Sequence, residues 1–164
     1  MQERPVWRIW IVLYVAMALQ TTWLADWRPF GARADLPLLT TVSTALLLGW
    51  EMGAIYGLLA GFLTGCFADY NVGSFAFSRA VVGGVFGGFD KGFSRDNPLA
   101  PPLCAIGAIV LANLIFWIMS PGDFTLRVWA QSTLTSAALN ALLMWPLHWL
   151  LERFVLPPTR MMFT

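Results

Sequence analysis

The chain has 164 residues, of which 58% are hydrophobic and only 12% are charged, and its formal net charge is +1. A soluble domain of this size needs far more polar surface around its core, so the composition excludes an ordinary soluble protein. No basic tract or acidic tail is present, and nucleic acid is therefore not an expected partner. We expect an all-α, polytopic integral membrane protein whose surroundings are the lipid bilayer.

Six apolar segments follow one another along the chain, and each is a candidate membrane-spanning helix. They cover residues 6–25, 36–49, 52–68, 74–89, 101–119 and 128–151. The connections between them are short, so we expect a single membrane domain over residues 1–164. The first segment is longer than the apolar region of a signal peptide, and we expect it to be a retained span.

Two of these segments are short for a membrane span. Residues 36–49 amount to about 21 Å of helix, with Pro37 in the first turn, where proline is tolerated. Residues 74–89 are rich in glycine and carry Arg79. We expect about six spans, but an arrangement of five spans with residues 74–89 at the membrane interface stays open.

The distribution of lysine and arginine among the loops predicts the orientation. With six spans, one side of the membrane collects Arg4, Arg8, Lys91, Arg95, Arg153 and Arg160. The other side collects Arg28, Arg33 and Arg127. This bias places both termini in the cytoplasm, whereas five spans would place them on opposite sides.

Glycines recur every fourth residue from Gly49 through Gly53, Gly57 and Gly61 to Gly65. A step of four residues drifts by about 40° around a helix of 3.6 residues per turn. The last three glycines therefore share one face that allows close helix packing, whereas we assign the first two to the turn before the third segment.

The fourth segment repeats the pattern with Gly83, Gly84, Gly87 and Gly88, of which Gly84 and Gly88 are the candidate packing or partner-binding residues. Packing within the chain is the favoured role of both glycine groups, but the single span of a partner protein could also use such a groove.

Two ionisable residues stand out in this region, Asp69 at the end of the third segment and Arg79 inside the fourth. Either both side chains extend to the membrane interface, or they form an ion pair that joins the two segments. Polar residues within other spans are Asn113, Ser136 and Asn140, and interhelical hydrogen bonds explain them better than a ligand cavity. We expect His148 at the interface.

Motifs of the common enzyme classes are missing from the sequence, including HExxH, GxSxG, the P-loop and paired carboxylates. The two cysteines lie in apolar segments, where they are typical of small buried residues rather than of a metal site or a disulfide. The expectation is a protein that is not an enzyme and holds neither a metal nor a cofactor.

One arrangement is more specific than the composition. Asp35-Leu36-Pro37 opens a short second span, the glycine-stepped third span follows, and Asp69 precedes Gly73 by a short gap. This arrangement resembles the family of the rod shape-determining protein MreD, small membrane proteins of bacterial cell elongation. In length, span order and charge the resemblance covers roughly residues 7–154.

The resemblance implies a non-enzymatic component of the elongation machinery in the bacterial cytoplasmic membrane. Its implied partners are MreC, a single-span protein with a periplasmic domain, and, directly or indirectly, MreB, RodA and the penicillin-binding protein of RodA. Self-association as a homodimer is left open. The implied fold has six helices, like the substrate-binding subunits of energy-coupling-factor transporters.

That likeness supplies an alternative function, the capture of a small vitamin-like ligand among the helices. The transporter subunits often carry two alanines four residues apart on their first helix, where this chain has Ala18 and Thr22. The alternative is therefore the weaker of the two.

Overall fold

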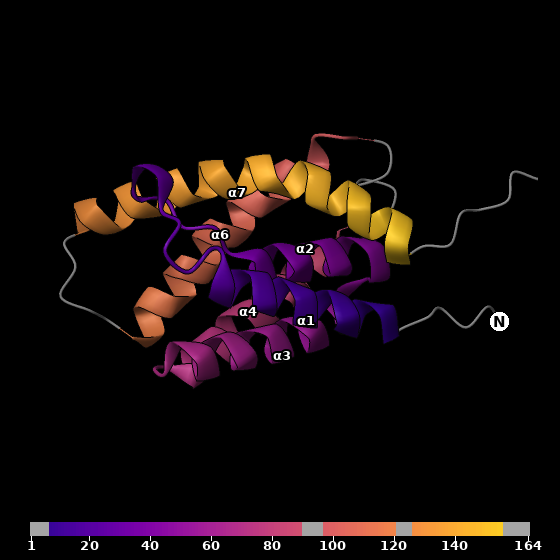
Figure 1. The fold of residues 1–164 in the computed structure, drawn as a ribbon, viewed down its shortest axis with the longest axis horizontal. Helices are drawn as coiled ribbons and strands as arrows, with labels where there is room; N and C mark the ends of the chain where they lie inside the picture. Colours follow the sequence, from indigo (N-terminus) through magenta and orange to yellow (C-terminus); the bar gives the residue numbers. More distant parts are fainter. Residues whose placement is uncertain (1–6, 90–96, 121–125, 156–164) are drawn as a thin grey trace, which may run out of the picture.

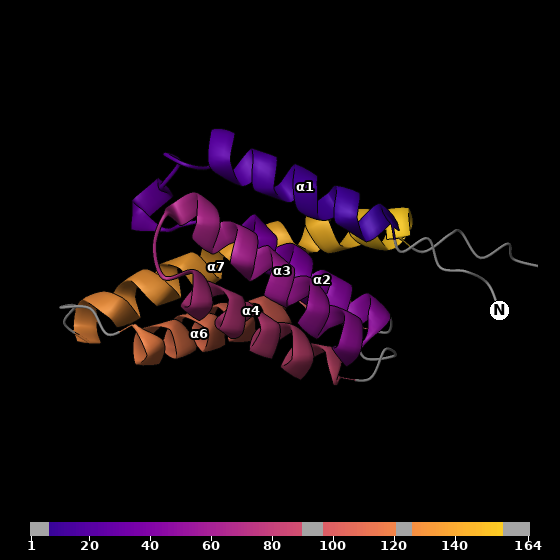
Figure 2. The ribbon, with the colours of Figure 1, turned by 90° about the horizontal axis from the view of Figure 1, so that it is seen from below.

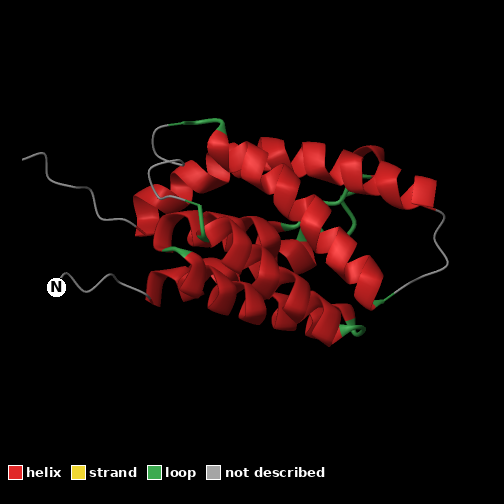
Figure 3. Ribbon diagram, turned by 180° about the vertical axis from the view of Figure 1, so that it is seen from behind, coloured by secondary structure: helices red, strands yellow, loops and turns green. Residues whose placement is uncertain are grey.

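The structure is a computed structural model that describes residues 7–89, 97–120 and 126–155. These residues form six α-helices and one short 3-10 helix, and no strand occurs among them (Figures 1 and 3). The elements are α1 (Trp7–Thr22), η1 (Pro29–Gly31), α2 (Leu36–Leu48), α3 (Trp50–Ala68), α4 (Val72–Gly87), α6 (Ala100–Met119) and α7 (Leu126–Val155). Each apolar segment predicted from the sequence overlaps one of the six α-helices, and α3, α4, α6 and α7 begin one or two residues earlier than predicted.

Three of the helices, α3, α6 and α7, are long and apolar enough to cross a membrane. Helices α1, α2 and α4 are shorter, and the 13 residues of α2 correspond to about 20 Å. The length and composition of the three long helices indicate a membrane protein.

Helix α2 lies in the middle of the bundle and contacts every other α-helix (Figures 1 and 2). All of its residues from Pro37 to Leu47 are buried, including its threonines and its serine. A helix enclosed on every side lacks a charged face, which matches the uncharged LPLLTTVSTALLL sequence of α2.

Helices α3 and α4 form an antiparallel hairpin in which the two backbones approach each other very closely. The turn between them contains Asp69 and Asn71, both with positive φ angles of 56° and 48°. Along α3, a Cβ atom at any of four glycines would collide with the backbone of α4. The opposing pairs are Gly53 with Gly83, Gly57 with Arg79, Gly61 with Phe75 and Ala76, and Gly65 with Val72.

The assignment of Gly53 to the turn before α3 was wrong, because Gly53 belongs to this contact. The row of residues spaced by four is inclined to the helix axis, and a partner helix that follows the row stays in contact despite the 40° drift. Gly49 does serve the turn, since it caps α3 with a φ angle of 100°.

Of the four glycines predicted to pack on α4, the close approach uses Gly83 and Gly87 rather than the candidate site residues Gly84 and Gly88. A Cβ atom at Gly87 would lie 2.5 Å from the Cα atom of Trp50. Gly84 has more room and Gly88 is exposed, so the close approach of α3 and α4 does not require a glycine at either position. A role for Gly84 and Gly88 in binding a partner stays a prediction.

Adjacent glycines on α4 provide a test of this packing. A Cβ atom at Gly83 would collide with the carbonyl oxygen of Gly53, whereas at Gly84 it would meet only the Ala54 side chain, at 3.8 Å. We expect Gly83→Ala to lower the free energy of unfolding by about 2 kcal/mol through overpacking. Gly84→Ala should be neutral or stabilising by up to about 1 kcal/mol. Thermal unfolding in detergent, followed by tryptophan fluorescence, compares the two, and equal stabilities would contradict the close approach.

Candidate functional site

A non-helical segment enters the bundle just before α2. Ala32 and Ala34 are buried, with exposed fractions of 4% and 1%. In a membrane protein, backbone groups outside helices must find hydrogen-bond partners within the protein, because lipid offers none.

Two side-chain amides provide those partners, one from α1 and one from α7. Gln20 Nε2 donates to the carbonyl oxygen of Ala34 at 3.0 Å, and Gln20 Oε1 accepts from the backbone N–H of Leu36 at 3.0 Å. Asn140 Nδ2 donates to the carbonyl oxygen of Arg33 at 2.9 Å, and Asn140 Oδ1 accepts from the backbone N–H of Asp35 at 2.9 Å. Each amide therefore uses both of its ends to hold the entering segment from one side.

The remaining predicted polar residues lie nearby. Ser136 Oγ accepts from the backbone N–H of Arg33 at 3.1 Å. Ser136 and Asn140 thus hold the entering segment rather than another helix, which differs from the expected helix–helix hydrogen bond. Asn113 does make such a bond, because its Nδ2 donates to Thr133 Oγ1 at 3.2 Å and links α6 to α7.

The carboxylate of Asp35 has two partners. Its Oδ1 accepts from the backbone N–H of Leu38 at 3.0 Å and so caps the first turn of α2, which also contains Pro37. Its Oδ2 accepts from Arg79 Nη2 at 2.5 Å in an ion pair. One side chain therefore starts the central helix and joins it to α4.

Arg79 is the most buried charge of this site, with only 4% of its side chain exposed. The Phe75 ring lies 4.9 Å from the centre of the guanidinium group, close enough for a cation–π interaction. The Arg79 Nε atom is buried and has no hydrogen-bond partner.

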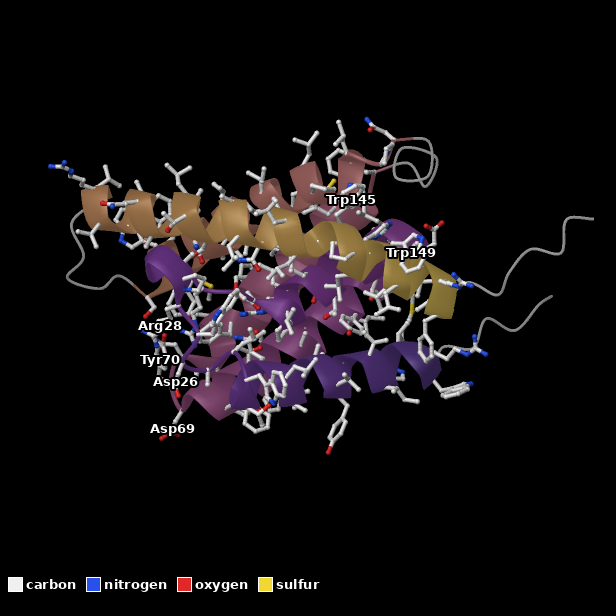
Figure 4. All side chains as sticks on the ribbon, turned by 45° about the horizontal axis from the view of Figure 1, so that its top comes forward. Asp26, Arg28, Asp69, Tyr70, Trp145 and Trp149 are labelled. Atoms are coloured by element: carbon white, nitrogen blue, oxygen red, sulfur yellow. The ribbon has the colours of Figure 1, made fainter. Side chains whose placement is uncertain are left out.

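The predicted pairing of Arg79 with Asp69 was wrong. Asp69 is exposed at the end of α3 (Figure 4), whereas Arg79 lies about two helical turns beyond the start of α4. At that depth the guanidinium group meets the start of α2 instead of the hairpin turn, and its partner is Asp35.

A cavity of about 440 Å³ opens at the same end of the bundle, beside this ion pair. Its walls include four aromatic residues, Phe67, Tyr70, Phe75 and Phe116. Polar side chains also line it, namely Gln20, Thr21, Arg33, Asp35, Thr64, Ser78, Arg79 and Asn113. This volume falls within the range of small-molecule sites in proteins, and the mixture of apolar walls with a few polar groups is typical of such sites.

A second buried polar contact lies between α2 and α7. Ser43 Oγ and His148 Nδ1 are 2.8 Å apart, and His148 is only 6% exposed. The expectation of an interfacial histidine was therefore wrong, because His148 turns toward the central helix.

Sequence reasoning missed Gln20 and the ionic role of Asp35. Both carried a signal: glutamine is costly within an apolar span unless it is bonded, and an aspartate two residues before a proline is typical of a helix start. The partners of these residues could not be found in the sequence, because they lie on other helices.

The fold and the site together define a helical membrane protein with a polar-lined cavity at one end. Comparison of the chain with protein-family models, with curated proteins and with solved structures finds no match.

The ion pair can be tested with two aspartate variants. Asp35→Asn keeps a good capping residue but leaves Arg79 as a buried charge without a counterion. We expect a loss of about 2 kcal/mol in the free energy of unfolding, less than for a fully buried pair because the Asp35 side chain is 27% exposed. Asp69→Asn, the control, should change stability by less than about 0.5 kcal/mol. A larger loss of stability in Asp69→Asn than in Asp35→Asn, measured by thermal unfolding, would instead support a pair between Asp69 and Arg79.

Hydrogen exchange tests how the entering segment is held. Asn140→Ala removes the acceptor of the Asp35 amide, and Gln20→Ala removes that of the Leu36 amide. We expect peptides covering residues 33–36 to exchange faster in both variants, because their amides are no longer protected. Asn113→Ala breaks only an α6–α7 hydrogen bond and should leave these peptides unchanged. Equal exchange in all three variants would show that the amides do not hold the segment.

Proposed function

We propose that the chain is a non-enzymatic membrane scaffold of the bacterial rod complex, related to MreD, which binds a single-span, MreC-like protein. The observation that carries the proposal is the place of the residues that resemble the family. Asp35 caps the central helix and pairs with Arg79, while the stepped glycines form the α3–α4 contact. These contacts support the proposal, because a chance match of residues common in membrane helices would not place the resembling residues in such contacts.

We further propose that all six α-helices cross the membrane. Helix α2 is short, but it lies inside the bundle, so its length need not match the thickness of the lipid. Helix α1 begins and α7 ends at the same end of the molecule, as an even number of crossings requires (Figure 1). With cytoplasmic termini, as the loop charges predict, the cavity opens toward the periplasm, where the soluble domain of an MreC-like partner lies.

The glycines of α3 are not available to the span of a partner, because α4 already covers them. Gly61→Leu and Gly65→Leu would therefore disrupt the fold and could not report on partner binding. The surfaces left for a partner are the outward apolar faces of the helices. Tyr14 on α1 and Leu142 on α7 exemplify them, with exposed fractions of 77% and 76%.

Site-specific photo-cross-linking tests the partner proposal. A benzophenone side chain is placed at Tyr14, at Ile118 or at Leu142, which are exposed on α1, α6 and α7. The chain is then expressed together with a single-span, MreC-like protein. We expect co-purification and a cross-link from at least one of these positions, and none from the same side chain at the buried Met144. A folded chain that neither co-purifies nor cross-links would refute the scaffold role.

The cavity favours a second candidate, the capture of a vitamin-like ligand as the binding subunit of an energy-coupling-factor-type transporter. Its volume of about 440 Å³ and its mixed lining support this function. The test is equilibrium binding of water-soluble vitamins to the purified chain. Tight binding of one vitamin, without binding of the MreC-like protein, would favour the transporter subunit over the scaffold.

A further inference from the structure

We infer that the cavity binds an oxyanion, a carboxylate or a phosphate, that is carried on an apolar body, and that Arg79 and Arg33 recognise the oxyanion. This inference goes beyond the scaffold role and does not depend on the MreC-like partner. It rests on the hydrogen-bond capacity, the charge and the wall chemistry of the cavity.

Hydrogen-bond donors exceed acceptors around Arg79. A guanidinium group carries several N–H donors in a planar fork, yet its one hydrogen bond to a described residue goes to Asp35 Oδ2. Both carboxylate oxygens of Asp35 already accept hydrogen bonds, from Leu38 and from Arg79. Because buried N–H groups are costly when they have no acceptor, the site favours a ligand that supplies acceptors.

The net charge of the cavity lining also favours an anionic ligand. Asp35 balances one of the two arginines that line the cavity, which leaves one positive charge in excess. Arg33 is exposed, and its side chain has no hydrogen bond to any described residue, while its backbone is held by Ser136 and Asn140. Its guanidinium group is therefore free to approach an anion without disturbing the fold.

The rest of the lining combines an apolar part, which favours an apolar body, with the polar side chains of Gln20, Thr21, Thr64, Ser78 and Asn113. Phe67, Tyr70 and Phe116 contribute aromatic surface, and Met17 contributes a thioether. A bare inorganic anion would fill only a small part of about 440 Å³ and would leave these walls without contacts. An acidic amphiphile satisfies both parts of the cavity, and either an anionic lipid headgroup or a free fatty acid provides this chemistry.

The experiment uses the full chain in detergent and measures binding through tryptophan fluorescence and thermal unfolding. The probes are dioctanoyl phosphatidic acid, dioctanoylglycerol, octanoate and inorganic phosphate. We expect an acidic amphiphile to bind at least ten-fold more tightly than dioctanoylglycerol and than phosphate. Preference for phosphatidic acid identifies a lipid headgroup, and preference for octanoate identifies a free acid. If dioctanoylglycerol binds as tightly as the acidic amphiphile, recognition of an oxyanion is wrong. If phosphate binds as tightly as the acidic amphiphile, recognition of an apolar body is wrong.

Arginine variants tie the binding to the cavity. Arg33→Gln should weaken the acidic amphiphile at least five-fold without lowering the melting temperature of the unliganded protein. Arg28→Gln is the matched control, because Arg28 is exposed in the same connection (Figure 4) but is not among the residues that line the cavity. The affinity of this variant should equal that of the unmodified chain. The double variant Asp35→Asn with Arg79→Met, which removes both charges of the ion pair, should lose the preference for the acidic probe. Identical affinities in these variants and in the unmodified chain would overturn the inference.

Discussion

The carboxylate of Asp35 is the group on which most of this structure depends. It caps the first turn of α2, the helix that every other α-helix contacts, and it neutralises Arg79, whose side chain is only 4% exposed. A charge in such surroundings persists only when it is paired and hydrogen-bonded. The amides of Gln20 and Asn140 then hold the backbone on either side of Asp35, so that the carboxylate has one position.

The glycine steps and the ion pair are two parts of one arrangement. Gly57 lies against the backbone carbonyl of Arg79 and beside Thr41 of α2. A side chain at this position would push α4 away from α2 and α3, and the guanidinium group would lose its contact with Asp35. The close approach of the backbones thus determines the depth of Arg79 in the bundle. This depth in turn determines where Arg79 and Asp35 line the cavity.

Much of the fold could be predicted from the sequence, because apolar length, proline and glycine are local signals. The pairing of Arg79 could not, because its partner lies 44 residues away on another helix, whereas Asp69 is close in sequence. The choice between Gly83 and Gly84 depends on how two helices are rotated against each other. A cavity is a property of several helices at once, so the sequence revealed some of its polar residues but not their convergence.

The most direct measurement is a double-mutant cycle between Asp35 and Arg79. Asp35→Asn, Arg79→Met and the double variant are compared with the unmodified chain in reversible unfolding. Because the two charges contact each other in a buried site, we expect a coupling free energy of about 2 kcal/mol, with the double variant more stable than the sum of the single losses implies. Losses that add within about 0.5 kcal/mol would contradict the ion pair and, with it, the account of the central helix and the cavity.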